Sequence, residues 1–171
     1  ISIPESVVSI GEWAFYDCEG LTSIYIPESV ASIESNAFFG CNCISSIYLT
    51  SIESWLSHWS PVIPACSSRN IYMNGKALTD VTIPDGVTRI GVWAFSGCKG
   101  LTSISIPGSV TSIGDCAFEG CTGLTSISIP GSVAGIGSFA FYNCTNIGTI
   151  FFNGHAPSIA EAAFKGVNTI A

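Results

Sequence analysis

Eight cysteines and two histidines are the side chains of this 171-residue chain most suited to nucleophilic or metal chemistry. Five of the cysteines share one position of a recurring pattern: Cys18, Cys41, Cys98, Cys121 and Cys144. Zinc needs a tetrahedron of ligands, whereas one position of a stacked repeat forms a row, and no histidine joins it at zinc-site spacing. Free cysteine behaves as a small apolar side chain, so the pattern predicts buried core thiols and no metal.

The remaining cysteines lie outside that position. Cys43, Cys66 and Cys116 are therefore better disulfide candidates than the row, in which parallel side chains on neighbouring rungs suit disulfide geometry poorly. Whether these three form disulfides stays open from the sequence.

The histidines and the acidic residues offer weak site chemistry. His58 lies between Trp55 and Trp59 and could act as a base toward Cys66, but no orienting third group stands at a recognisable spacing. Glu5 and Glu28 occupy one turn position of adjacent units, which falls short of the 6 to 8 oxygens that calcium takes. We expect no catalytic residue, no metal and no cofactor.

Composition narrows the class of partner. The chain is 47% hydrophobic and 10% charged, with a formal net charge of −7 and only five scattered cations. Nucleic acid and anionic membranes are therefore poor candidate partners, and no apolar run approaches the ~18 residues of a membrane-spanning helix. No linker-like stretch divides the chain, so we expect one domain over 1–171, and the start in mid-pattern suggests a fragment of a longer protein.

A 23-residue repeat decides the architecture. Ile-Pro ends an extended segment at five places, which are 23 residues apart except across residues 47–80, where the repeat is interrupted. Other positions keep the same register, among them Phe15, Phe38, Phe95, Phe118, Phe141 and Phe164. A unit of this size has too little core to fold alone, but coils stacked at the ~4.8 Å spacing of paired strands bury each position as a continuous stripe. The repeat predicts a solenoid.

The order of residues within a unit predicts its elements. Residues 101–106 follow the L-x-x-L-x-L frame of leucine-rich repeats, and Pro107 ends the strand because proline donates no ladder hydrogen bond. Val110 and Ile113 indicate a second short extended segment. Residues 117–121, Ala-Phe-x-Gly-Cys, indicate one tight helical turn closed by glycine.

The full unit, Leu-Thr-Ser-Ile-x-Ile-Pro-x-Ser-Val-x-x-Ile-Gly-x-x-Ala-Phe-x-x-Cys, resembles the BspA-like class of bacterial leucine-rich repeats over residues 1–46 and 81–149, and more loosely over 150–171. The resemblance implies a right-handed horseshoe with a parallel sheet on its concave face. It also implies a secreted or cell-surface bacterial protein of a group associated with adhesion, and no catalytic residue.

Two departures from the repeat are informative. Residues 47–80 exceed one unit by 11 residues, and Asn74-Gly75 between extended residues predicts a type I′ hairpin near 71–79 inside an irregular repeat. Residues 150–171 lack the Ile-Pro and the cysteine, and we expect them to form a degenerate capping repeat.

The outward strand positions are the most informative about function. They carry aromatic residues in the first half of the chain and small hydroxyl residues in the second. We take as candidate ligand-binding residues Tyr25, Tyr48, Tyr72, Trp55 and Trp59. Tyrosine and tryptophan favour binding surfaces because they bury much area with few torsions to freeze, although cross-strand packing would also explain them.

Three functions remain open from the sequence. The leading hypothesis is a non-catalytic extracellular module that binds a protein of a host or neighbouring cell through the strand face. The second is a carbohydrate-binding accessory module of a larger enzyme, and the third is a structural spacer. The apolar first coil also predicts end-to-end self-association of the fragment.

Overall fold

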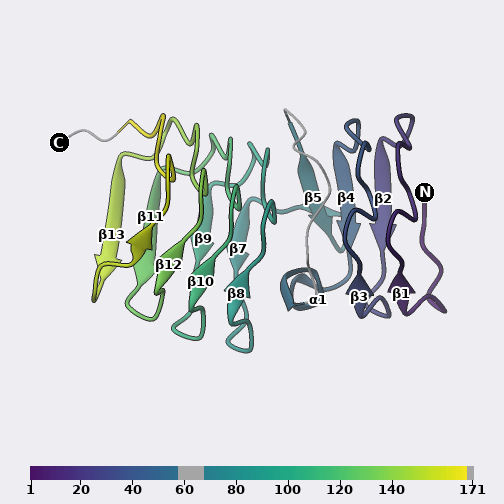
Figure 1. The fold of residues 1–171 in the computed structure, drawn as a ribbon, viewed down its shortest axis with the longest axis horizontal. Coiled ribbons are helices and arrows are strands. Elements are labelled where there is room, and N and C mark those ends of the chain that lie inside the picture. Colours follow the sequence, from purple (N-terminus) through teal and green to yellow (C-terminus); the bar gives the residue numbers. More distant parts are fainter. Residues whose placement is uncertain (58–67, 169–171) are drawn as a thin grey trace.

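The 23-residue spacing is the pitch of a solenoid in the computed structural model, which describes residues 1–57 and 68–168 (Figure 1). The predicted leucine-rich-repeat solenoid with parallel strands is confirmed. One strand of each coil lies on a main face, which we call the strand face: β2 (Ser23–Ile26), β4 (Ser46–Leu49), β5 (Asn70–Met73), β7 (Asp80–Thr82), β9 (Ser103–Ser105), β11 (Ser126–Pro130) and β13 (Thr149–Asn153).

A second row of two-residue strands follows the proline turns, as expected for the short second extended segment. It consists of β1 (Ser9–Ile10), β3 (Ser32–Ile33), β8 (Arg89–Ile90), β10 (Ser112–Ile113), β12 (Gly135–Ile136) and β14 (Ser158–Ile159). The last four of these form one parallel sheet, in the order β14-β12-β10-β8.

Backbone pairing places each residue beside its equivalent in the next coil. Ile24 pairs with Ile47 on the strand face, and Ile113 pairs with Ile136 in the second row, both at an offset of 23. Hydrogen bonds outside the strands also join neighbouring coils; for example, the Phe118 amide donates to the Ala140 carbonyl at 2.7 Å. Each repeat position therefore becomes a straight row through the molecule.

The phenylalanine position shows how these rows build the core. The Phe118 ring lies 5.0 Å from that of Phe141, with an angle of 9° between their planes, and Phe141 stacks on Phe164 at 5.1 Å and 3°. Phe15 and Phe38 stack in the same way at 5.0 Å in the first two coils. The predicted phenylalanine row is therefore confirmed on both sides of the irregular repeat.

The segment after the second strand differs from the prediction of a helical turn. It is a series of hydrogen-bonded turns, in which the amide of Ala117 donates to the carbonyl of Gly114 and that of Cys121 to Phe118. Positive φ angles at Cys116 (53°) and Gly120 (69°) interrupt any helix. The prediction was wrong about conformation because Ala-Phe before Gly-Cys does not reveal that the preceding residue is left-handed.

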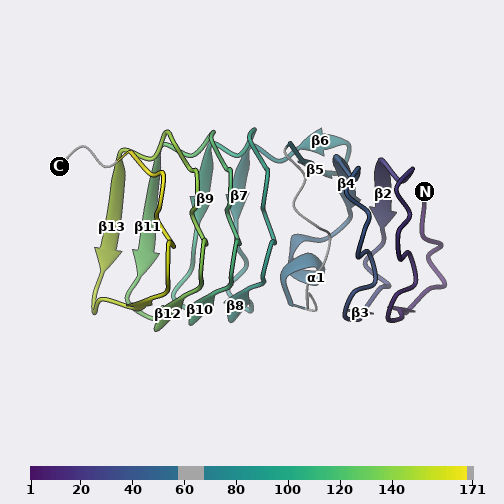
Figure 2. The same cartoon turned by 45° about the horizontal axis from the view of Figure 1, so that its top comes forward.

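The predicted hairpin is confirmed in the irregular repeat. β5 pairs antiparallel with β6 (Lys76–Ala77), and Asn74 and Gly75 both have positive φ, 52° and 75°, as a type I′ turn requires. Figure 2 shows the hairpin at one edge of the stack, between the two groups of coils. Because β6 occupies the far edge of β5, the hydrogen-bonded sheet β2-β4-β5-β6 ends there and β7 pairs with β9 instead.

A short helix replaces the second strand of this repeat, which we did not predict. Helix α1 (Ile52–Ser57) lies between β3 and β8 (Figure 1). The Ser51 hydroxyl caps the helix by accepting a hydrogen bond from the amide of Ser54 at 3.2 Å. The negative charge of Glu53 in the first turn interacts favourably with the helix dipole. Ser51 was therefore a usable sequence signal for the helix start.

We predict that Phe118→Ala lowers the free energy of unfolding by about 3 to 5 kcal/mol, because it removes a fully buried ring that stacks on both neighbours. Urea unfolding followed by circular dichroism measures this. Phe151→Ala is the matched control, since its ring is 54% exposed, and we expect a change of about 0.5 kcal/mol or less. Equal losses in the two variants would contradict a core built on this row.

Candidate binding surface on the strand face

Three tyrosines form a row across the N-terminal part of the strand face. Tyr25 pairs in register with Tyr48, and Tyr48 with Tyr72. The Tyr48 side chain is 38% exposed. Its ring stacks on that of Tyr72 with centroids 4.8 Å apart and planes 16° apart. The structure thus brings three predicted site residues together, and we call Tyr25, Tyr48 and Tyr72 the tyrosine row.

The tryptophans behave differently from the tyrosines. Trp55 was expected to extend the aromatic surface, but its side chain is only 3% exposed. Its indole nitrogen donates to the carbonyl of Ala94 at 3.1 Å, so Trp55 links helix α1 to the coils that follow. The prediction was wrong because helix α1 turns this residue into the core. Trp59, His58 and Cys66 lie outside the described residues.

An acidic groove adjoins the tyrosine row where the strands end. The Tyr25 hydroxyl donates to Oε1 of Glu5 at 3.4 Å. Desolvation, followed by the negative charge of Glu5, raises the pKa of Tyr25 above its ordinary value. An open groove of about 580 Å³ lies beside this contact, and we call it the acidic groove; its lining is Glu5, Glu28, Ser29, Ala31, Ser51, Glu53 and Ser54.

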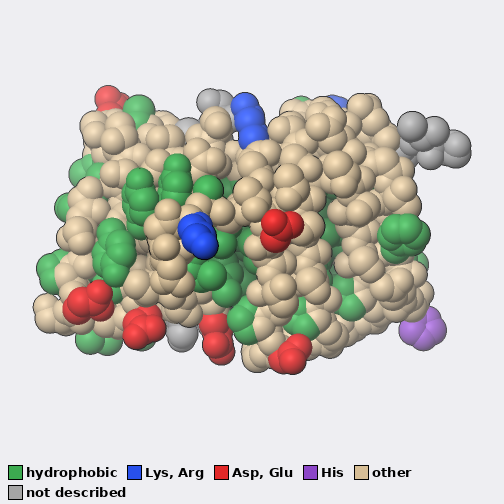
Figure 3. All heavy atoms as spheres, turned by 180° about the vertical axis from the view of Figure 1, so that it is seen from behind, with side chains coloured by type: hydrophobic (Ala, Val, Ile, Leu, Met, Phe, Trp, Pro, Cys, Tyr) green, Lys and Arg blue, Asp and Glu red, His purple; other side chains and the backbone are tan. Residues whose placement is uncertain are grey.

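The C-terminal part of the strand face carries mainly small hydroxyl groups, as the sequence indicates, with the exposed Phe151 on its last strand, β13. Its one acidic residue among the described strand positions, Asp80, accepts hydrogen bonds from Ser103 and Thr79, and these bonds lower the pKa of its carboxyl. Figure 3 views the strand face, with hydrophobic and tyrosine side chains over the N-terminal half and acidic side chains along the lower edge. The two halves therefore offer different chemistry to a partner.

All five cysteines of the row were predicted to be buried in the core, which is confirmed for four of them and wrong for Cys18. Cys41, Cys98, Cys121 and Cys144 are buried, while Cys18 of the first coil is exposed. The Cys121 thiol donates to the carbonyl of Phe95 in the preceding coil, 3.0 Å away, and Cys144 donates in the same way to Phe118. The row therefore ties neighbouring coils together through sulfur.

Burial keeps these thiols protonated. It raises the pKa of Cys98 and of Cys144 to about 12, and that of Cys121 well above the ordinary thiol value. Nucleophilic chemistry needs the thiolate, so these groups are unsuited to catalysis near neutral pH.

The off-row cysteines are free thiols where the structure describes them. Cys43 is exposed and Cys116 is buried, and neither forms a disulfide. Within residues 1–57 and 68–168, no group of three or more His, Cys, Asp or Glu side chains could hold a metal ion. Over the same residues, every helix is too short and too polar to cross a bilayer.

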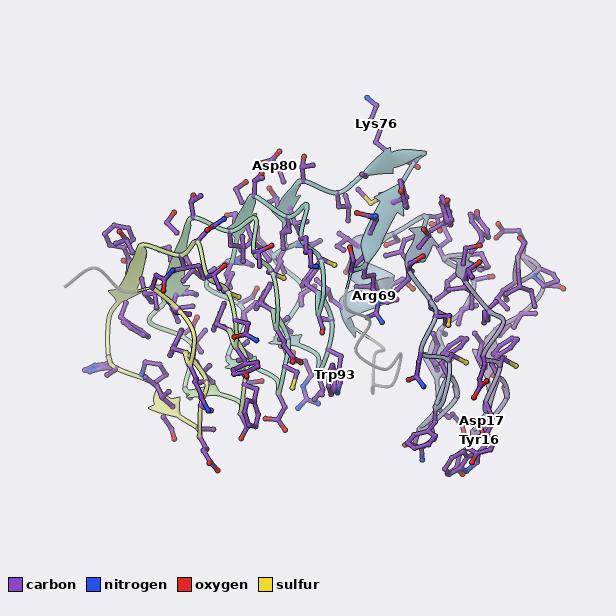
Figure 4. All side chains as sticks on the ribbon, turned by 90° about the horizontal axis from the view of Figure 1, so that it is seen from above. Tyr16, Asp17, Arg69, Lys76, Asp80 and Trp93 are labelled. Atoms are coloured by element: carbon purple, nitrogen blue, oxygen red, sulfur yellow. The ribbon has the colours of Figure 1, made fainter. Side chains whose placement is uncertain are left out.

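A second aromatic cluster was missed by the sequence reasoning. The Trp13 ring lies 5.1 Å from that of Tyr16 and 5.9 Å from that of Phe39, and all three side chains are between 45% and 50% exposed. Figure 4 shows Tyr16 and Trp93 on the side opposite Lys76 and Asp80, so this cluster lies on the turn edge. Its signal was the presence of aromatic residues flanking the Ala-Phe pair in several repeats.

The family of the chain follows from a match that covers most of its length. A model of the BspA type leucine-rich repeat region matches six copies, over residues 1–58 and 68–171. The chain belongs to the BspA-type leucine-rich repeat family. A search of curated protein sequences gave no match.

Solved structures of similar proteins agree with this family. A leucine-rich cell surface protein from Faecalibacterium prausnitzii is 27% identical with a TM-score of 0.57, and the alignment covers 90% of this chain and 47% of that one. A leucine-rich repeat protein from Eubacterium ventriosum is 27% identical with a TM-score of 0.61, and the alignment covers 98% of this chain and 46% of that one. A leucine-rich repeat protein from Bacteroides ovatus is 25% identical with a TM-score of 0.56, and the alignment covers 99% of this chain and 49% of that one. The BspA-type chain thus spans about half the length of these proteins.

We predict that alkylation at about pH 8 separates the cysteines by burial. Cys18 and Cys43 are exposed and should react quickly with iodoacetamide, whereas Cys98, Cys121 and Cys144 should stay unmodified until the protein unfolds. Because their pKa values are raised, these thiols stay protonated across the neutral and mildly alkaline range. Peptide mass spectrometry after a short pulse measures this, and equal labelling of Cys121 and Cys43 would contradict the buried row.

Proposed function

We propose that this chain is a non-catalytic, extracellular recognition module that binds a protein through the tyrosine row on its strand face. The observation that carries the proposal is the in-register, partly exposed arrangement of Tyr25, Tyr48 and Tyr72 on adjacent strands, in which the rings of Tyr48 and Tyr72 stack. Paired strands hold the backbones of these residues and stacking holds two of the rings, so little freedom is lost when a partner binds.

The orientation of the rings favours a protein over a glycan. A sugar ring stacks on an open aromatic face, yet Tyr48 and Tyr72 cover one face of each other with their planes 16° apart. One face of each ring in this pair is therefore closed to a sugar, while the ring edges and hydroxyl groups suit hydrogen bonds and edge contacts with polypeptide. A carbohydrate-binding role is therefore the less favoured alternative.

The small hydroxyl side chains of the C-terminal half suit a spacer role for that half. Ser103, Ser105 and Ser126 are exposed and present little apolar area. We propose that this part carries the N-terminal surface without contributing strongly to binding. This division also fits the position of the irregular repeat between the two halves.

A location at the cell surface is part of the proposal. The Faecalibacterium prausnitzii protein, which this chain resembles over 90% of its own length, is a cell surface protein by name. Adhesion to a protein of a host or neighbouring cell would follow from that location, since such a partner is reachable only from outside the producing cell.

We predict that the double variant Tyr25→Ser/Tyr48→Ser weakens binding to a partner captured from extracellular matrix and mucin proteins by about tenfold or more, as expected for interface anchors. Surface plasmon resonance with the captured protein measures this. Tyr16→Ser is the matched control, because Tyr16 is 50% exposed and lies on the turn edge.

Two outcomes would count against the proposal. Unchanged affinity in the double variant, with full loss in Tyr16→Ser, would move the binding surface to the turn edge. Saturable binding on a glycan array, together with silence toward all matrix proteins, would favour the carbohydrate module.

A further inference from the structure

The acidic groove and the tyrosine row form one continuous surface. Tyr25 belongs to the row and hydrogen-bonds Glu5 of the groove, and Glu28 follows Tyr25 by three residues at the end of β2. Glu53 adds a third carboxylate from the first turn of helix α1. A partner that covers the tyrosine row therefore reaches the carboxylates without crossing another part of the molecule.

We propose that the occupant of this joint surface is an extended protein segment rich in lysine and arginine, which lies across the coils with its basic side chains in the acidic groove. This inference rests on the proposed function, because it names the class of partner for the same strand face. It adds the prediction that charge, as well as aromatic contact, selects the partner.

Charge complementarity is the first argument for a basic occupant. The described residues that line the groove include three carboxylates and no lysine or arginine. Glu5 and Glu28 stand at equivalent positions of adjacent coils, where like charges repel unless a cation lies between them. A basic side chain placed there would relieve this repulsion, and the overall charge of −7 would favour its approach.

An unused hydroxyl on the groove wall is the second argument. In the C-terminal coils the equivalent serines tie neighbouring coils together: Ser109 Oγ donates to the Val87 carbonyl at 2.9 Å and Ser132 Oγ to the Val110 carbonyl at 2.7 Å. Ser29 Oγ occupies the same position beside Glu28, is buried, and makes no hydrogen bond. Because this atom is itself buried, the Ser29 side chain would rotate toward the groove to bind a polar group of a ligand, without losing a hydrogen bond to the neighbouring coil.

The dimensions of the surface suit an extended segment. Coils stack at ~4.8 Å, so three coils extend over ~9.6 Å, and alternate residues of an extended chain are ~6.8 Å apart. Basic side chains at three alternating positions, over ~13.6 Å, are therefore long enough to cover the carboxylates of three coils. Lys76 on β6 projects from the strand face just beyond β5 (Figure 4). Its positive charge repels a basic segment there and limits the occupied length to the N-terminal half.

The direct test uses a decapeptide of alternating lysine and serine, labelled with a fluorophore, and measures binding by fluorescence anisotropy. The groove variant is Glu5→Gln/Glu28→Gln/Glu53→Gln. The control variant is Glu12→Gln/Glu34→Gln/Glu161→Gln, which removes three exposed carboxylates outside the groove and changes the net charge by the same amount. Circular dichroism melting of both variants checks that they remain folded.

We expect the groove variant to bind the lysine peptide about tenfold or more weakly than the wild type, and the control variant to lose about threefold at most. Raising the salt concentration from about 0.05 M to about 0.5 M should weaken the binding of the lysine peptide to the wild type, since exposed ion pairs are screened. A peptide of alternating glutamate and serine should not bind. Equal losses in the two variants would show a net-charge effect only, and unchanged binding in the groove variant would likewise overturn the inference.

The same variants separate this inference from the proposed function. If Tyr25→Ser/Tyr48→Ser abolishes binding of the captured matrix protein while the groove variant retains it, the tyrosine surface stands and the basic occupant is rejected. If the tyrosine variant leaves that binding unchanged, the proposed function is contradicted, and the lysine peptide still decides the fate of the groove.

Discussion

Backbone pairing joins each residue to its equivalent in the next coil, at an offset of 23 residues, or 24 where β4 pairs with β5, and the rest of this structure depends on this constraint. Once Ile24 pairs with Ile47, and Phe118 is held by the Ala140 carbonyl, every other position of the repeat must stack on its own equivalent. A side chain that packs well on its own equivalent therefore stabilises every coil in which it occurs, as the stacked phenylalanine rings do. The tyrosine row and the buried thiols follow from the same rule.

Periodicity made the regular part of the fold predictable, because one residue type at one position reports the same environment several times. The core rows and the strands before each proline follow from this periodicity. Asn74-Gly75 identified the hairpin because few pairs of consecutive residues readily adopt positive φ at both positions. The left-handed residues, such as Trp93 at φ 61°, were unpredictable, since bulky side chains rarely adopt that conformation. Here the inter-coil hydrogen bond from its amide to the Asp115 carbonyl holds it.

The sequence predicted an irregular repeat with a hairpin, but it did not predict helix α1. The position of Trp55 in the candidate site depended on that helix. The sequence placed Trp55 on the binding surface because the repeat gives no frame in that segment. Helix α1 instead directs Trp55 inward to Ala94, and the amide of the buried Arg69 donates to the carbonyl of Gly97. These contacts join the aromatic half of the molecule to the hydroxyl half, and the hairpin ends the first sheet just beyond the tyrosine row. The acidic groove depends on the same segment, because Glu53 comes from helix α1.

The five tyrosines of the chain provide the most direct measurement of where a partner binds. Tyr25, Tyr48 and Tyr72 lie on the strand face, whereas Tyr16 and Tyr142 belong to the turn segments. Hydroxyl-radical footprinting with mass spectrometry, performed with and without a captured matrix protein, reports the accessibility of each ring in one experiment. Our account predicts that the partner protects Tyr25, Tyr48 and Tyr72 and leaves Tyr16 and Tyr142 unchanged. Protection of Tyr16 or Tyr142, with the strand-face tyrosines unaffected, would contradict it.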